Sequence, residues 1–134
     1  MPDDNLALVR AVFDAMRSGD RSAYLGRLDP DLTIEPSANA PEQRVLRGVD
    51  GFERWISVWP GLFEEYEVHP ERFSVAGDDV VVALHETARS ARSDHPIEDR
   101  FAHVWTVRHG VVVRIRVFDD ERAALDAADP DGEP

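Results

Sequence analysis

The segment from Pro96 to Asp120, PIEDRFAHVWTVRHGVVVRIRVFDD, constrains the fold more than any other part of the chain. Apolar residues alternate with other residues on both sides of His109-Gly110, a pattern typical of two half-buried strands joined by a tight turn. An ionisable imidazole on an otherwise apolar face predicts a ligand pocket, and an ordinary core can contain such a group too. On the first strand, this apolar face carries Phe101, His103, Trp105 and Val107.

The length of the turn decides which residues share that face. A two-residue loop would pair Arg108 with Val111, whereas a three-residue loop with Gly110 in the left-handed conformation would pair Val107 with Val111. We predict the three-residue loop, because it gathers the apolar residues of both strands on one side. His103 would then lie opposite Ile115. The face would also carry Val113, Val117 and Asp119, with Asp119 four residues beyond Ile115, or on the order of 13 Å away.

In the rest of the chain, the spacing of apolar residues predicts mostly helices first and strands afterwards. Spacings of three, four and seven between apolar residues predict helices, and period-two alternation predicts strands. The predicted helices cover 5–17, a short stretch after Asp20 with the apolar stripe Tyr24, Leu25 and Leu28, 50–65, and 121–128. Within 50–65, Pro60 must start a new turn, kink the helix or break it, because it cannot donate a backbone hydrogen bond. The predicted strands cover 32–35, 45–47, 68–75, 80–90, 97–108 and 111–118. This order predicts one α+β domain over 1–128, with helices packed on an antiparallel sheet, and a disordered acidic tail over 129–134.

Composition excludes several classes of function. The net charge of −12 disfavours nucleic acid as a partner, because such a surface repels phosphates. The chain has no cysteine and no lysine, which excludes disulfides, thiolate chemistry and Schiff-base cofactors. No stretch is long and apolar enough to span a membrane and no leader opens the chain, so we expect a cytoplasmic protein without a membrane partner.

Three segments together resemble the SnoaL-like group of the NTF2-like superfamily. They are FDAMRSGDRSAYLGRLDPDLTIEP, a glycine-initiated aromatic helix, and RFAHVWTVRHGVVVRIRVFDD, and the resemblance covers roughly residues 5 to 128. It implies a cone-shaped α+β fold whose curved sheet wraps around a deep pocket. It also implies a small hydrophobic ligand and a homodimer built on the outer face of the sheet.

The chemistries of this superfamily place different residues at the matching positions. The general base of ketosteroid isomerase falls on Pro36 and its oxyanion-hole tyrosine on Val12, so two of its three roles are lost; its second oxyanion donor falls on His103. The Asp-Arg-Asp set of limonene epoxide hydrolase falls on His103, Phe101 and Asp119. SnoaL-type polyketide cyclases resemble this chain in an acid/base aspartate at Asp119, which keeps its residue type.

We therefore predict His103 and Asp119 as catalytic residues. A histidine in a half-dry pocket acts as a general acid or base, or donates a hydrogen bond to a ligand oxygen, near neutral pH. The alternative is a core histidine bonded to a neighbour. Asp119 also precedes a predicted helix that begins at Glu121, where an aspartate caps backbone N–H groups. We favour this capping role over the catalytic one for Asp119.

Other residues are candidates for ligand contact or for a metal. On strand 80–90, His85 and Arg89 would face the cavity unless Glu86 is the inward residue. Glu35 is a further candidate base, although strand alternation directs it away from the pocket. A metal site from His85, His103 and a carboxylate lacks close ligand spacing, so we predict no metal and no cofactor. Aromatic and aliphatic candidates, each of which could equally be core, are Trp55, Trp59, Phe101, Trp105 and Val117.

These expectations combine into a cofactor-free enzyme, an isomerase, cyclase, hydrolase or hydratase of a small hydrophobic substrate. The alternative is a non-catalytic ligand-binding or dimerisation module with the same pocket. Turnover distinguishes the two, and a pH–rate profile with a limb near pH 6 to 7 would favour the enzyme. Replacement of His103 by alanine is expected to abolish turnover and leave the melting temperature nearly unchanged.

Overall fold

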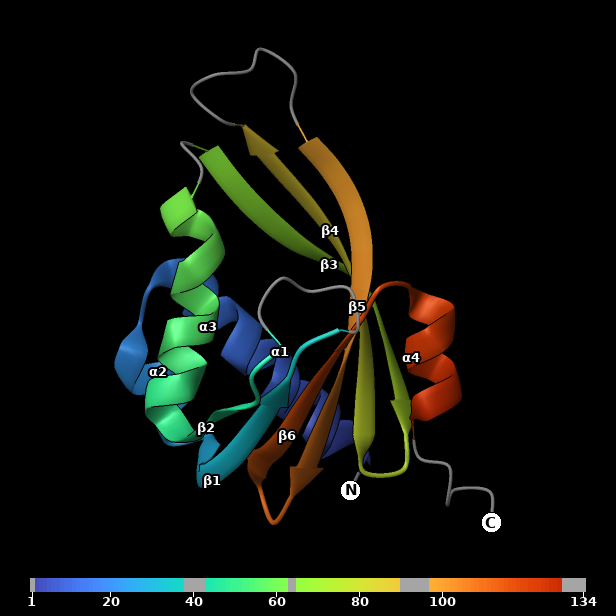
Figure 1. Ribbon diagram of the computed structural model, residues 1–134. Coiled ribbons are helices and arrows are strands. Elements are labelled where there is room, and N and C mark those ends of the chain that lie inside the picture. Colours follow the sequence, from blue (N-terminus) through green and yellow to red (C-terminus); the bar gives the residue numbers. More distant parts are fainter. Residues whose placement is uncertain (1, 38–42, 63–64, 90–96, 129–134) are drawn as a thin grey trace.

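The computed structural model describes residues 2–37, 43–62, 65–89 and 97–128. These residues form an α+β structure in which helices cover a curved sheet (Figure 1). This is the fold class predicted from the order of helical and strand patterns in the sequence. The helices are α1 (Pro2–Ser18), α2 (Arg21–Leu25), α3 (Gly48–Leu62) and α4 (Glu121–Ala127). The strands are β1 (Leu28–Glu35), β2 (Leu46–Arg47), β3 (Glu65–Ala76), β4 (Asp79–Arg89), β5 (Ile97–Arg108) and β6 (Val111–Phe118).

The strands form one sheet in the order β2-β1-β6-β5-β4-β3. Strands β3 to β6 follow one another as an antiparallel meander, as predicted. The predicted antiparallel arrangement holds for the other pairs, but β1 pairs with β6 in parallel. Through this pairing β6 lies beside the first strand of the chain, with Ile34 opposite Ile115, and β2 and β3 form the two edges of the sheet.

The turn between β5 and β6 differs from the predicted three-residue loop. Arg108 pairs with Val111, and both His109 and Gly110 have positive φ, as in a two-residue type I′ turn. The register then shifts, because Val107 pairs with Val112 whereas Thr106 pairs with Arg114. Val113 is therefore the extra residue of a β-bulge, which restores the alternation that a plain two-residue loop would have inverted. The apolar residues consequently gather on the predicted face, but His103 lies opposite Val117 and not opposite Ile115.

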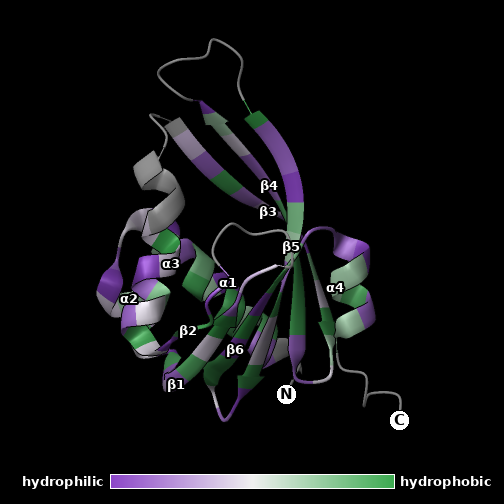
Figure 2. Cartoon of the chain, in the orientation of Figure 1, coloured by the Kyte–Doolittle hydropathy of each residue, from purple (hydrophilic) through white to green (hydrophobic). Residues whose placement is uncertain are grey.

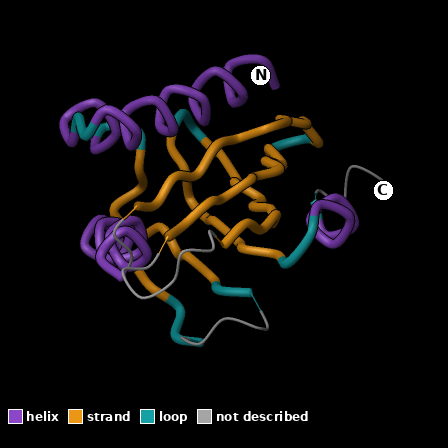
Figure 3. Tube along the Cα trace, turned by 90° about the horizontal axis from the view of Figure 1, so that it is seen from above, coloured by secondary structure: helices purple, strands orange, loops and turns teal. Residues whose placement is uncertain are grey.

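The two faces of the sheet are covered by different helices. Seen from above, α1 and α3 lie on the concave face and α4 lies on the outer face (Figure 3). Helix residues Val9, Val12, Phe13 and Phe52 pack against the concave face, whose buried residues include Val80, Val82, Leu84, Trp105, Val107, Val112 and Ile115. On the outer face, Ala124 and Ala128 pack against Val81, Ala102 and Val104. Figure 2 shows the contrast with the far end of β5, where residues 98–100 are hydrophilic and exposed.

Several element boundaries differ from the prediction. The second helix ends at Leu25, so Leu28 does not belong to its apolar stripe but begins β1. The Arg27 carbonyl there accepts a hydrogen bond from the Val112 N–H, which starts the parallel pairing with β6. Pro60 lies in the last turn of α3, and Glu65, predicted to end that helix, begins β3. The predicted acidic tail, 129–134, lies outside the described residues.

Candidate functional site

His103 lies on the concave face of β5 inside a cluster of aromatic side chains. Its side chain is almost fully buried, with 4% of the residue exposed. The distances from its ring centroid to the other centroids are 5.1 Å for Trp55, 5.4 Å for Phe101, 6.1 Å for Trp105 and 6.2 Å for Phe13. These four rings come from α1, α3 and β5, so the packing of both helices on the sheet fixes the surroundings of His103. We call Phe13, Trp55, Phe101, His103 and Trp105 the aromatic cluster.

One ring nitrogen of His103 has a defined partner. The indole Nε1 of Trp105 donates a hydrogen bond to His103 Nδ1 over 3.1 Å. Within the part of the chain that the structure describes, the other nitrogen, Nε2, has no hydrogen-bond partner. Burial lowers the pKa of His103 to about 3, because the charged imidazolium would lose its hydration among apolar rings. His103 is therefore neutral at physiological pH.

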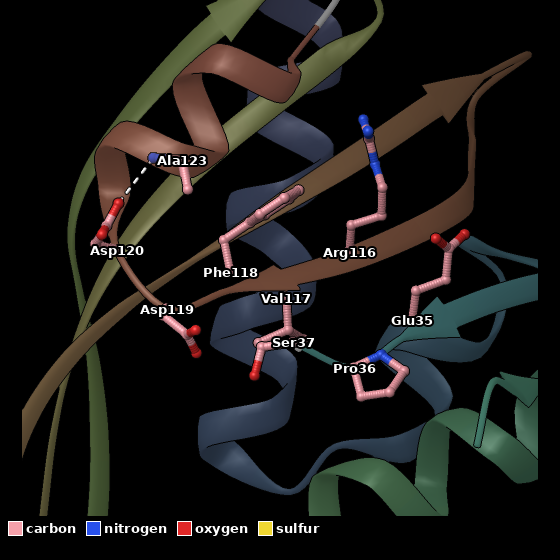
Figure 4. A pocket seen from close by; sticks show the side chains of 9 residues that line it. All are labelled: Glu35, Pro36, Ser37, Arg116, Val117, Phe118, Asp119, Asp120 and Ala123. Carbon is pink, nitrogen blue, oxygen red and sulfur yellow. Dashed lines mark hydrogen bonds between the residues drawn. The ribbon is translucent and has the colours of Figure 1, made fainter. Parts of the chain in front are cut away.

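A pocket of about 350 Å³ lies at the end of β6 (Figure 4). It forms where β1 and β6 part: their pairing reaches Glu35 opposite Arg116, and β6 continues to Phe118. Val117 lines the pocket and is also the cross-strand partner of His103, whereas its neighbours Arg116 and Phe118 line the pocket from the outer face of the sheet. His103 itself is not a lining residue. The lining residues are Glu35, Pro36, Ser37, Arg116, Val117, Phe118, Asp119, Asp120 and Ala123.

Asp119 belongs to this pocket and does not cap α4. The N-cap is Asp120, whose carboxylate accepts a hydrogen bond from the Ala123 N–H over 2.8 Å, so the predicted cap was displaced by one residue. Asp119 is exposed and lies two residues beyond Val117, not four residues beyond the partner of His103. Its expected separation from His103 along the strand shortens to about 7 Å.

A polar network on the outer face of the sheet includes two of the lining residues of the pocket, Glu35 and Arg116. Arg114 forms two hydrogen bonds with Glu35, which points away from the aromatic cluster as strand alternation predicts. Arg116 Nη2 lies 3.3 Å from Asp79, and Asp79 accepts a hydrogen bond from Thr106 Oγ1 over 2.6 Å. Arg116 Nε is buried without a hydrogen-bond partner among the residues that the structure describes, and burial lowers the pKa of this guanidinium. These charges are thus occupied largely with one another.

His85 and Arg89 do not face the aromatic cluster. Val82 pairs with His103 and Leu84 with Phe101, so the even-numbered residues of β4 point inward and His85 and Arg89 point outward. His85 Nε2 lies 2.9 Å from a carboxylate oxygen of Glu98, close enough for an ion pair but not aligned for a hydrogen bond. His85 and His103 thus lie on opposite faces, which contradicts the idea of a metal held by both.

Glu86 is the inward residue of this strand, the alternative that the sequence left open. Tyr66 Oη donates a hydrogen bond to Glu86 Oε1 over 2.8 Å, and Asp99 lies directly across from Glu86 on β5. Burial and the charge of Asp99 raise the pKa of Glu86, while the Tyr66 bond opposes this shift. Sequence reasoning missed Tyr66, although its alternation with Val68 on β3 was an available signal.

The remaining candidates divide by what the structure describes. Trp55, Phe101 and Trp105 belong to the aromatic cluster, and Val117 lines the pocket. Trp59 lies on α3, but its side chain is outside the described residues. Among the residues described, no three His, Asp or Glu side chains are close enough together to hold a metal ion, and no helix is long and apolar enough to cross a membrane.

Comparison of the sequence with known protein families gives one match. Residues 9–115 match the model of the SnoaL-like domain. No curated protein sequence is significantly similar to the chain. A protein of Jannaschia sp. CCS1 assigned as a SnoaL-like polyketide cyclase is 22% identical, with a TM-score of 0.75 over 100% of this chain and 95% of that one.

Two further solved structures share the fold. An NTF2-like protein of Burkholderia thailandensis is 24% identical, with a TM-score of 0.75 over 94% of this chain and 98% of that one. TerC, co-crystallised with polyporic acid, is 22% identical, with a TM-score of 0.73 over 92% of this chain and 96% of that one. These TM-scores show that the NTF2-like fold is shared.

Proposed function

Because the chain belongs to the SnoaL-like domain family, we propose that it binds a small hydrophobic molecule beside His103 and converts it by cofactor-free acid/base chemistry. The reaction classes that fit are isomerisation, cyclisation, and hydrolysis or hydration. The observation that carries the proposal is the position of His103, a polar ring among four aromatic side chains whose cross-strand neighbour, Val117, lines a pocket. A pocket of about 350 Å³ is of the size that small ligands occupy.

The two predicted catalytic residues take different roles in this proposal. One end of the ligand occupies the pocket at Asp119, and the other passes Val117 to reach His103. Asp119 removes a proton from a carbon next to a carbonyl group, and the electron pair moves onto the carbonyl oxygen. A hydrogen bond from His103 stabilises that oxygen while the proton returns to a different carbon, so atoms and charge balance in an isomerisation. Phe101, Trp55 and Trp105 hold the apolar part of the ligand.

Two relatives support a ligand of this kind. TerC was crystallised with polyporic acid, and the Jannaschia protein is assigned as a polyketide cyclase. Each of these two proteins is 22% identical to this chain. Their ligand and assignment favour small organic molecules as the class to test first.

The second candidate function is a non-catalytic ligand-binding module. The observation that favours it is the enclosure of His103, which is 4% exposed and is not a lining residue of the pocket. In such a module the pocket would hold a molecule at Asp119 while His103 only completes the core.

Turnover separates these two functions. We expect the wild-type chain to convert at least one member of a panel of aromatic ketones and polyketide-type compounds, followed by mass spectrometry. His103→Leu places an apolar side chain in the core but removes the hydrogen-bond donor, so it should lower kcat by about 10²-fold or more. The same loss is expected for Asp119→Asn. Since the pKa of His103 is about 3, the rate profile should lack a limb near pH 6 to 7 from this residue.

The matched control is His109→Gln, because His109 lies exposed in the turn between β5 and β6 and has no role in the proposal. Burial of His103 means that its replacement also lowers stability, contrary to the sequence-based expectation, so rates are compared at a temperature where every variant is folded. Saturable binding of a panel member with no product at any pH would favour the module.

We also propose a homodimer through the outer face of the sheet. Helix α4 covers Val81, Ala102 and Val104 on this face, so a second copy would meet the strip that carries Glu35 and Arg114. Sedimentation velocity is expected to give twice the mass of the chain. Arg114→Glu, which sets a second negative charge beside Glu35, should shift the species toward monomer. A monomer of the wild-type chain at all concentrations would contradict the proposal.

A further inference from the structure

Trp105 is completely buried, and its indole N–H points along the concave face of β5 toward His103. The two residues are two positions apart, so their side chains lie on the same face of the strand. A buried indole N–H needs an acceptor, because an unpaired donor in an apolar core is costly. His103 Nδ1, 3.1 Å away, is that acceptor. The bond therefore satisfies the indole and at the same time occupies one side of the imidazole.

This bond is compatible with only one protonation state of His103. A neutral imidazole carries one N–H group and one lone pair, on different nitrogens. If Nδ1 accepts from the indole, the proton must be on Nε2. In the other tautomer, and in the charged ring, an N–H on Nδ1 would face the indole N–H, and two donors would stand against each other.

We propose that Trp105 is a positioning residue that holds His103 as the neutral Nε2–H tautomer, so that the site offers a hydrogen-bond donor and no proton acceptor. This inference rests on the proposed function where it concerns the ligand, and it narrows the class. The atom of the ligand that meets His103 must be an acceptor, such as a carbonyl, phenolate or enolate oxygen. His103 then stabilises charge on that oxygen and does not remove a proton.

The surroundings of His103 support a fixed tautomer. The side chains that face it from the packed elements are Phe13 of α1, Trp55 of α3, Val82 of β4, Phe101 of β5 and Val117 of β6. These side chains carry no charge. None of them therefore competes with the indole for His103 Nδ1 or stabilises an imidazolium. Burial acts in the same direction by lowering the pKa of the ring.

Nitrogen NMR of the full-length, ¹⁵N-labelled chain tests the inference without any ligand. The His103 signals are assigned by their loss in His103→Gln. We expect Nε2 to carry the proton and Nδ1 to be bare, with both signals unchanged between pH 8 and pH 5. We also expect a scalar coupling across the hydrogen bond between Trp105 Nε1 and His103 Nδ1. A proton on Nδ1, or no coupling between the assigned nitrogens, would overturn the inference.

Two variants separate positioning from packing. Trp105→Phe keeps a buried ring but removes the donor, so the His103 signals should change to a mixture of both tautomers. Trp55→Phe is the matched control, because it alters a ring of the aromatic cluster that forms no hydrogen bond with His103 in the described structure. An unchanged single tautomer in a folded Trp105→Phe variant would contradict the role of Trp105.

If Trp105→Phe does not fold, the scalar coupling in the wild-type chain still decides the question. The two proposals also fail separately. A fixed Nε2–H tautomer without any turnover would refute the enzyme and leave the positioning role intact. Turnover with a proton on Nδ1 would support the enzyme and refute the positioning role.

Discussion

Replacement of His103 by glutamine is expected to remove a large part of the acid sensitivity of the fold. In the unfolded chain the imidazole has a pKa of about 6.5, whereas burial lowers it to about 3 in the folded protein. Below pH 6.5 the unfolded state therefore binds a proton that the folded state does not, and the free energy of unfolding falls as the pH falls. The slope is about 1.4 kcal/mol per pH unit, which amounts to about 3 kcal/mol between pH 6.5 and pH 4.

Urea unfolding at pH 8 and at pH 4 measures this effect. His103→Gln is expected to be less stable than wild type at pH 8, because its bond with Trp105 and its packing change. The difference in the free energy of unfolding between wild type and His103→Gln should be smaller by about 3 kcal/mol at pH 4 than at pH 8, since only the wild type has to keep His103 uncharged. The same substitution at exposed His109 shows what loss of an imidazole outside the core does to the curve. A difference that is constant with pH would mean that water reaches His103 in the folded protein.

Replacement of Asp79 by alanine is expected to destabilise the fold by about 3 kcal/mol, because it leaves buried polar groups without their partner. Asp79 is 6% exposed. It accepts a hydrogen bond from Thr106 over 2.6 Å and lies 3.3 Å from Arg116, whose Nε has no hydrogen-bond partner in the described part of the chain. The variant would bury the Arg116 guanidinium without its counter-charge. The free energy of unfolding from urea titration measures the loss.

The neighbouring residue provides the control. Asp78 and Arg108 also form an ion pair, at 3.5 Å, but both side chains are 62% exposed. Asp78→Ala should therefore change the free energy of unfolding by less than about 1 kcal/mol. Equal losses for Asp78→Ala and Asp79→Ala would show that the turn between β3 and β4, rather than the buried network, limits stability.

The concave face of β5 could be predicted from the sequence because its alternation is unambiguous. Phe101, His103 and Trp105 share one face, as expected. The turn after it was wrong for a physical reason. A three-residue loop and a two-residue loop followed by a bulge at Val113 both add one residue and restore the same face, so the apolar pattern cannot distinguish them. They differ in register, which changed the partner of His103 from Ile115 to Val117.

The orientation of β4 could not be predicted, because both of its faces are buried. Val80, Val82 and Leu84 pack under α1 and α3, while Val81 packs under α4, so the run shows no alternation. The inward position of Glu86 follows only from pairing with β5. The parallel pairing of β1 with β6 and the pocket at its end are likewise long-range contacts without a local signal. Adjacent aspartates gave no reason to prefer Asp120 over Asp119 as the cap.

In the proposed enzyme, a ligand reaches His103 from the pocket and accepts a hydrogen bond from its Nε2. The most direct measurement is a crystal structure of the full chain soaked with polyporic acid, the compound held by TerC. We expect the compound in the pocket beside Val117 and Asp119, with one of its oxygen atoms about 2.7 to 3.2 Å from His103 Nε2. An empty pocket at saturating concentration, or a ligand bound elsewhere with Phe13 and Trp55 still closed around His103, would contradict the account.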